Sequence, residues 1–183
     1  MGNSGSGKST VAARVAALLD VPHIEMDALH HGPNWTEVPD EVMRARVTDA
    51  VRGDGWVADG NYSAVRDLLW PRAELLVWLD LPLHVILRRL TRRTFHRWRQ
   101  KEELWGLAGN RESLRTQLAS RDSLFLWTLT SHRSRRRRYL ELIAGNEYPQ
   151  LRIVRLTTVR DVNRWLDEVA AGETARARGD GES

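Results

Sequence analysis

Close to its start the chain reads Gly2-Asn3-Ser4-Gly5-Ser6-Gly7-Lys8-Ser9-Thr10. This run matches the pattern G-x-x-x-x-G-K-[ST], whose glycines let successive backbone N–H groups turn toward a bound phosphate. An apolar helical stripe follows at once, formed by Val11, Val15, Leu18 and Leu19. A helix N-terminus behind the loop adds a dipole that favours an anion. The sequence therefore predicts an ATP-binding phosphate loop over residues 2–10, rather than a flexible Gly/Ser-rich terminus that matches by chance.

Two side chains of this loop have expected chemical roles. Lys8 carries a positive charge that would reach the β- and γ-phosphates of ATP, so we predict it as a catalytic residue. The hydroxyl of Ser9 is the group that coordinates Mg²⁺ in loops of this pattern. The predicted cofactors are therefore ATP and Mg²⁺.

In mononucleotide-binding folds a buried strand runs into such a loop, whereas only Met1 precedes Gly2 here. We expect the reading frame to begin upstream, so that the central strand of the sheet is missing from the chain as given. An extended frame would then show a run of Val, Ile and Leu ending at Gly2. An upstream stop codon without such a run would contradict this expectation.

Along the rest of the chain, short apolar runs alternate with amphipathic helical segments, a pattern typical of parallel α/β sheets. Strands are expected at 23–26, 55–58, 74–79 and 151–156, and further helices at about 39–51, 82–100, 112–143 and 161–171. We predict an α/β P-loop NTPase domain over residues 1–171, with a three-layer parallel sheet, helices on both faces and a helical lid insertion at about 92–138. Thr158 or Asp161 would cap the last helix. The small, polar tail at 172–183 is predicted to be disordered.

The composition excludes some kinds of site and partner but does not identify the function. The 183 residues include no cysteine, which excludes disulfides and thiolate metal sites, and the formal net charge is +4. No leader or membrane-spanning run is visible, so a cytoplasmic protein without a membrane partner is the default expectation. The run Arg135-Arg136-Arg137-Arg138 leads directly into apolar residues, which favours the charged start of an amphipathic helix. A nucleic-acid partner is therefore disfavoured.

Three motifs together carry a family resemblance: GNSGSGKST at 2–10, IEMDALHH at 24–31 and GWVADGNYS at 55–63. From Gly2 to about Leu166 the chain resembles the adenylate-kinase-like P-loop kinases, and more closely the bacterial "topology modulation" ATPases. This resemblance implies that Asp59 is the Walker-B-type carboxylate that holds Mg²⁺ through water.

The resemblance has one departure with chemical consequences. The chain reads Asn61-Tyr62-Ser63 where true adenylate kinases have Phe-Pro-Arg. The arginine of that motif grips the monophosphate acceptor, so its absence puts AMP as the acceptor in question. Arg66, about one helical turn later, is a candidate substitute.

Asp27 follows the first predicted strand and is the candidate general base. It resembles the acidic residue that small-molecule P-loop kinases place beside the acceptor hydroxyl, where it would accept a proton or bind a Mg²⁺-bound water. A helix or turn cap is the alternative. Trp35 would offer a stacking surface in the loop that follows, and the adjacent His30 and His31 lack the further ligands of a zinc site.

Arginines crowd the predicted helix at 82–100, and in the kinases that this chain resembles, such arginines neutralise the transferring phosphate. We predict Arg93 there, and Arg133 after the lid, as catalytic residues. A solvated helical face is the alternative for any single one.

The predicted function is transfer of the γ-phosphate of Mg-ATP to a small acceptor, a nucleotide or metabolite. The alternatives are an ATPase associated with nucleic acid and a nucleotide-binding regulator without turnover. Motor-type ATPases place a glutamate beside the Walker-B aspartate, whereas Gly60 follows Asp59 here. That difference favours transfer over hydrolysis.

Overall fold

The computed structural model describes residues 1–100, 104–107, 110 and 124–179. The described strands are β1 (His23–Glu25), β2 (Val57–Asp59), β3 (Leu75–Leu79) and β4 (Arg152–Leu156). The described helices are α1 (Lys8–Leu19), α2 (Met26–His30), α3 (Asp40–Ala50), α4 (Arg66–Leu69), α5 (Leu83–Gln100), α7 (Leu124–Ala144) and α8 (Val159–Gly179). Short 3₁₀ turns lie at Pro33–Trp35, Ser63–Val65 and Leu104–Gly106. Helices and strands alternate, which confirms the α/β class.

All paired strands run parallel, as predicted, but within the described residues they form two separate pairs. β1 pairs with β2, with Ile24 opposite Ala58, and β3 pairs with β4, with Val77 opposite Val154. Gly2 makes a parallel bridge to Leu79 of β3, whose N–H donates to the Met1 carbonyl at 2.9 Å. Met1 and Gly2 thus lie along β3. The strand expected ahead of Gly2 stays a prediction.

Each strand pair has an apolar core of its own. The core beside β1 and β2 is built from Ile24, Met26, Met43, Val47, Val51 and Val65. The core beside β3 and β4 is built from Val15, Leu79, Leu81, Ile86, Leu156, Val162 and Leu166. These side chains come from strands and from the apolar stripes of the helices that cover them, so burial of apolar surface fixes both halves.

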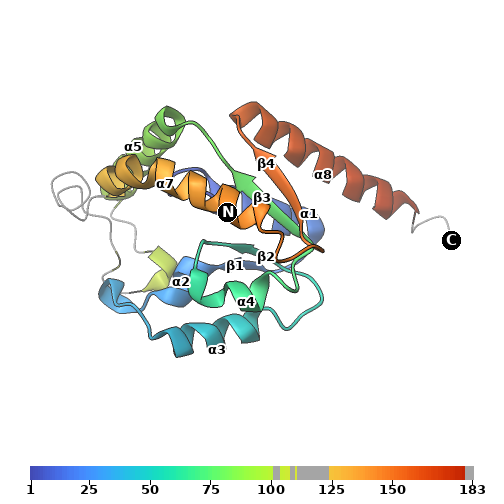
Figure 1. Ribbon diagram of the computed structural model, residues 1–183, viewed down its shortest axis with the longest axis horizontal. Coiled ribbons are helices and arrows are strands. Elements are labelled where there is room, and N and C mark those ends of the chain that lie inside the picture. The colour runs from blue at the N-terminus through green and yellow to red at the C-terminus, as the bar shows by residue number, and fades with distance from the viewer. Residues whose placement is uncertain (101–103, 108–109, 111–123, 180–183) are drawn as a thin grey trace.

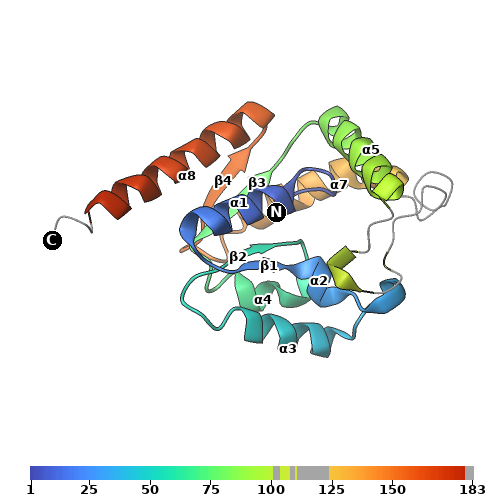
Figure 2. The same ribbon diagram turned by 180° about the vertical axis from the view of Figure 1, so that it is seen from behind.

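Helices lie on both faces of the β3–β4 pair. In Figure 1, α7 crosses in front of β3, and in Figure 2, which shows the molecule from behind, α1 lies in front of the same strand. α8 runs beside α1 and extends away from the body of the molecule toward the C-terminus. The other strand pair is covered by α3 and α4, which lie beneath it in Figure 1.

Most element boundaries fall close to their predicted positions, and the C-terminal tail is the main correction. Residues 172–179 were expected to be disordered, whereas α8 continues to Gly179. Ala and Arg, which have high helix propensity, occupy 175–178, and this explains the extension. Residues 180–183 lie outside the described part.

The predicted cap of the last helix is confirmed in both of its forms. The Thr158 N–H donates to Asp161 Oδ2 at 2.9 Å, and the Asp161 N–H donates to Thr158 Oγ1 at 3.1 Å. This reciprocal pair is a capping box, and it fixes where α8 begins.

The predicted lid insertion at about 92–138 is described at its two ends and, within it, at residues 104–107 and 110. α5 leads into it, and α7 leads out of it and packs against α5. Residues 101–103, 108–109 and 111–123 of this insertion lie outside the described residues.

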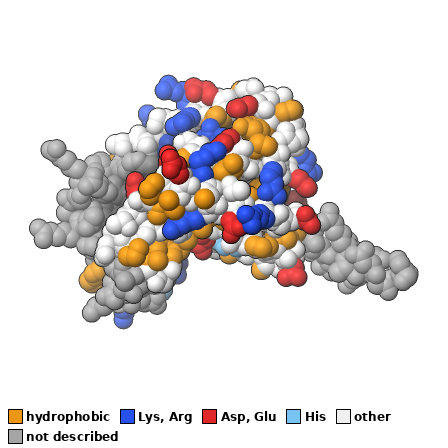
Figure 3. Space-filling model, turned by 90° about the horizontal axis from the view of Figure 1, so that it is seen from below, with side chains coloured by type: hydrophobic (Ala, Val, Ile, Leu, Met, Phe, Trp, Pro, Cys, Tyr) orange, Lys and Arg blue, Asp and Glu red, His pale blue; other side chains and the backbone are white. Residues whose placement is uncertain are grey.

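The surface seen from the side of α3 carries both signs of charge. In Figure 3, Lys and Arg side chains alternate with Asp and Glu side chains among hydrophobic ones. Arg44 of α3 pairs with Asp67 of α4 at 2.7 Å, and Arg52 pairs with Asp49 at 3.1 Å. The positive charge of the chain is therefore not gathered into one basic surface on this face.

Candidate functional site

Residues 2–7 form a compact turn between the Gly2–Leu79 bridge and the first turn of α1. Gly5 has φ 81° and Gly7 has φ 96°, values that only glycine adopts without strain. The Ser6 N–H closes the turn by donating to the Asn3 carbonyl at 3.1 Å. Ser6 is fully buried, and its Oγ has no hydrogen-bond partner within the described residues. The predicted loop is thus a turn that requires glycine at its bends, directly followed by a helix N-terminus.

The Lys8 side chain folds back over this turn. Its Nζ donates to the Asn3 carbonyl at 3.2 Å. Burial lowers the Lys8 pKa below its ordinary value, Asp27 and Asp59 act in the opposite direction, and the charges of Arg135 and Arg93 lower it further. Two of the predicted carboxylates and one predicted arginine are therefore electrostatic neighbours of the predicted catalytic lysine.

Asp27 lies in α2 and has a partner that the sequence analysis missed. The Tyr62 hydroxyl donates to Asp27 Oδ1 at 2.7 Å. Burial raises the pKa of Tyr62, and the negative charge of Asp27 adds to this effect, so the phenol stays protonated and remains a donor. Tyr62 follows the Asp59-Gly60 turn closely in sequence, and this was the only signal that could have found it.

Asp59 ends β2, and its side chain is buried. His23 Nε2 lies 3.4 Å from Asp59 Oδ1. This contact joins the parallel strands β1 and β2, and the sequence did not predict it. Within the described residues no group of three or more His, Cys, Asp or Glu side chains could hold a metal by itself. Mg²⁺ commonly takes one or two carboxylates and completes its shell with waters and substrate phosphates. Asp59 and the exposed hydroxyl of Ser9 fit such a shell in chemical type.

Asn61 ties the loop to β2, although the sequence analysis noted it only as a departure. Its Oδ1 accepts from the Gly2 N–H at 3.2 Å, and its Nδ2 donates to the Gly2 carbonyl at 2.6 Å. One side-chain amide thereby satisfies both backbone groups of the residue that opens the loop. Arg89 attaches the loop to α5 as well, because its Nη1 donates to the Ser6 carbonyl at 2.8 Å.

The two predicted lid arginines lie on the helices that flank the loop. Arg93 belongs to α5, and its charge acts on Lys8. Arg133 belongs to α7 and follows His132, whose Nδ1 lies 2.6 Å from Asn3 Nδ2. Arg135 also acts on Lys8, although the sequence predicted it only as part of the charged start of an amphipathic helix. The roles of Arg93 and Arg133 stay predictions.

Trp35 belongs to an aromatic cluster next to α2. His31 stacks on Trp105 with ring centroids 5.7 Å apart, and Trp35 meets both rings edge-on. Trp105 Nε1 donates to Glu25 Oε2 at 3.0 Å, so the cluster is attached to β1. Trp35 is 38% exposed, which leaves part of its ring system available for contact.

A cavity of about 100 Å³ lies between β2 and β3, lined by residues of both strands and by Tyr139 of α7. Asp59, Asn61, Tyr62 and Arg66 line it on the β2 side. The guanidinium of Arg66 lies over the ring of Trp70, 4.9 Å from its centroid. Arg66 as a substitute acceptor-gripping residue stays a prediction.

Comparisons with known proteins add no family assignment. No model of a protein family matches the chain, and no curated protein matches it either. In the part of the chain that the structure describes, no helix combines the length and the apolar character needed to cross a bilayer.

Proposed function

We propose that this protein is an ATP-dependent phosphotransferase of the P-loop NTPase fold, similar to the adenylate-kinase-like kinases. The observation that supports it best is the arrangement around Lys8. A turn that needs glycine at its bends precedes a helix N-terminus, and the Lys8 side chain folds over this turn. Two carboxylates and two arginines lie near enough to affect the pKa of Lys8. A phosphate chain needs backbone donors and positive charge, whereas phosphate transfer also needs carboxylates for a metal and for a proton.

The nucleotide would lie with its phosphates along residues 2–10. Backbone N–H groups of the turn and the first turn of α1 would donate to phosphate oxygens, and Lys8 would neutralise charge on the β- and γ-phosphates. Ser9 and Asp59 would hold Mg²⁺, which supplies further charge neutralisation when it is bound. Arg93 and Arg133 would contribute positive charge from the two lid helices.

Asp27 would act on the acceptor. As the acceptor hydroxyl attacks the γ-phosphorus, its proton passes to a carboxylate oxygen of Asp27, and the bond from phosphorus to the leaving ADP oxygen breaks. Tyr62 already donates to Oδ1 at 2.7 Å, which leaves Oδ2 for the acceptor. The acceptor is proposed to be a small nucleotide or metabolite, with no nucleic-acid or membrane partner.

Calorimetry with Mg-ATP tests the proposal most directly. The folded wild-type protein should bind Mg-ATP, and Lys8→Ala should abolish turnover, because it removes the charge that compensates the transferring phosphate. Arg14→Ala is the matched control, since Arg14 is another basic residue of α1 whose side chain is 54% exposed and pairs weakly with Asp167. Folded wild-type protein that takes up no Mg-ATP would contradict the proposal.

A metabolite screen then separates transfer from hydrolysis. ADP release that depends on an added nucleotide or small metabolite supports the kinase. Hydrolysis stimulated only by DNA would instead support the alternative, an ATPase associated with nucleic acid.

A further inference from the structure

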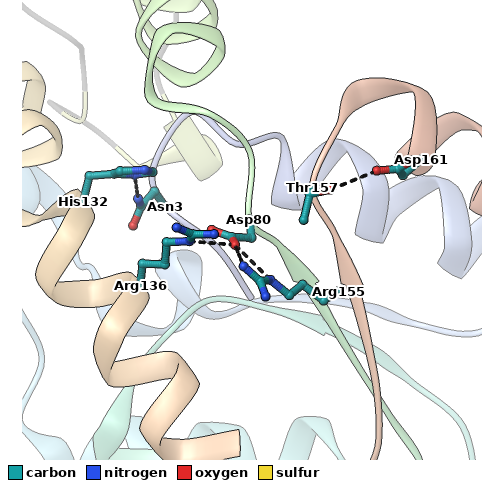
Figure 4. A network of polar contacts seen from close by, with 7 residues as sticks. All are labelled: Asn3, Asp80, His132, Arg136, Arg155, Thr157 and Asp161. Carbon is teal, nitrogen blue, oxygen red and sulfur yellow. Dashed lines mark hydrogen bonds and ion pairs between the residues drawn. The ribbon is translucent and has the colours of Figure 1, made fainter.

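One stripe of α7 is docked on the phosphate loop and on β3. His132 Nδ1 lies 2.6 Å from Asn3 Nδ2, Arg136 Nε donates to Asp80 Oδ2 at 2.9 Å, and the Tyr139 ring meets the Trp78 ring edge-on with centroids 5.8 Å apart. These three α7 residues are spaced four and three apart, so they share one helical face. Figure 4 shows His132 and Arg136 reaching from α7 toward Asn3 and Asp80.

Asp80 is the fixed point of this contact. Its side chain is only 4% exposed, and besides Arg136 it accepts from Arg155 Nε of β4 at 2.9 Å. The Arg155 guanidinium also lies over the Trp78 ring, 4.7 Å from its centroid. A buried carboxylate that binds two guanidinium groups is held in place from both sides. The position of α7 is therefore tied to the ends of β3 and β4, directly beside the loop.

Arg135 lies on α7 next to this docked stripe. It comes three residues after His132, about one helical turn along α7, and it is half-buried, whereas Arg133 is exposed. Its charge lowers the pKa of Lys8, which is independent support for its place near the phosphate-binding lysine.

We propose that Arg135 is a phosphate-contacting residue of this site, and that His132, Arg136 and Asp80 are positioning residues that set it across from Lys8. This inference rests on the proposed function, because it assigns a partner to Arg135 within the same nucleotide site. It differs from the sequence prediction, which chose Arg133 on the same helix.

The test is Mg-ATP affinity, measured by calorimetry on single variants and on a double variant. Arg135→Ala should weaken Mg-ATP binding about tenfold, as expected for loss of a hydrogen bond between charged groups. Arg136→Met should weaken it about fivefold, because α7 loses its attachment to Asp80. Arg135→Ala combined with Arg136→Met should bind no more than about twofold more weakly than Arg135→Ala alone, because one residue acts through the other.

Two controls keep these results interpretable. Arg137→Ala changes the same residue type on the same helix, and the Arg137 side chain is 79% exposed in an ion pair with Glu141. It should leave the affinity unchanged. Arg136→Met retains the apolar stem and leaves Asp80 paired with Arg155, so the variant should fold, and faster amide hydrogen exchange along α7 would report the lost attachment.

Additive losses for Arg135→Ala and Arg136→Met would overturn the positioning role. A larger loss for Arg133→Ala than for Arg135→Ala would overturn the choice of Arg135. If the wild-type protein binds no Mg-ATP, the proposed function fails, and the assignment of Arg135 as a phosphate contact fails with it. Hydrogen exchange in Arg136→Met would still decide whether Asp80 holds α7 in place, since unchanged exchange would refute the docking.

Discussion

The half of the molecule built on β1 and β2 differs in chemistry from the half built on β3 and β4. The first contributes the carboxylates Asp27 and Asp59, and each of them has a neutral or ionisable neighbour, Tyr62 or His23. The second is joined by α5 and α7, which contribute arginines. Lys8 lies between them and is affected by both sets. Under the proposed function, the positive charge on one side would serve the nucleotide, and the carboxylates on the other side would serve the proton and the metal.

Removing a carboxylate from the half built on β1 and β2 should have the largest effect, and the effect should be on turnover. Asp27→Asn should lower turnover about 10²- to 10⁴-fold, as for loss of a general base, while Mg-ATP affinity changes little. Steady-state kinetics with an acceptor from the metabolite screen, together with calorimetry, would measure both. Tyr62→Phe removes only the hydrogen bond to Asp27 and should reduce turnover less. A loss of affinity without a loss of turnover would make Asp27 a ground-state binding residue.

A large-to-small substitution in one core should destabilise mainly the half of the molecule that contains this core. Met43 is fully buried in the core beside β1 and β2, so Met43→Ala should lower the free energy of unfolding by about 2–5 kcal/mol. Amide hydrogen exchange should rise in β1 and β2 more than in β3 and β4. Val162→Ala, in the other core, should reverse that pattern. An equal rise in both halves for each variant would show that the two cores unfold as one unit.

The tie between the halves at Asn61 should have a smaller effect on stability. Asn61→Ala removes two hydrogen bonds to Gly2 and should cost about 1–3 kcal/mol in urea unfolding, with weaker Mg-ATP binding as the loop loosens. Asn61→Asp retains an acceptor for the Gly2 N–H but loses the donor to its carbonyl, so it should fall between. Gln150→Ala is the control, because its exposed amide also donates to backbone carbonyls, those of Trp70 and Pro71. Equal losses at both positions would remove the special role of Asn61.

The smallest effect should come from two histidines, one in each half. Burial lowers the pKa of both His31 and His132 below the ordinary 6.5. His31 is also affected by His30, Asp27 and Glu37, and His132 by Asp80, Arg136 and Arg133. Because the folded state disfavours their protonation, their contribution to stability is complete above about pH 6.5 and declines as the pH falls below it.

Urea unfolding at pH 7.5 and at pH 5.5 measures this decline. His31→Gln together with His132→Gln should make the free energy of unfolding less dependent on pH in that range. A double variant with the same pH dependence as the wild type would assign the decline to other groups.

The sequence predicted those features that depend on neighbours along the chain. The strand expected at 74–79 occupies Leu75–Leu79, and the Thr158–Asp161 cap forms as expected, because apolar runs and capping pairs are local signals. Gly5 and Gly7 adopt the positive φ angles that the loop pattern requires. The prediction of a disordered tail was wrong for 172–179, where α8 continues, because polar composition was weighted above helix propensity.

Contacts between distant segments could not be predicted in this way. Asn61 meets Gly2 across 59 positions, and Asp80 meets Arg136 across 56 and Arg155 across 75. In the sequence Asp80 is only the residue that follows the strand expected at 74–79, and the packing of α7 and β4 around it is what reveals a buried carboxylate. Arg135 likewise differs from its arginine neighbours only through the face of α7 that it occupies.

Because Arg136 and Arg155 share the single carboxylate of Asp80, a net positive charge remains beside the loop. One negative charge faces two guanidinium groups, and both of these remain partly open to water. In buffer, the surplus is balanced by mobile counter-ions, which an arriving polyanion would displace. Binding of a polyanion to this surface should therefore weaken as ionic strength rises. The Debye length shrinks from about 30 Å at 0.01 M to about 8 Å at 0.15 M, which screens the two guanidinium charges.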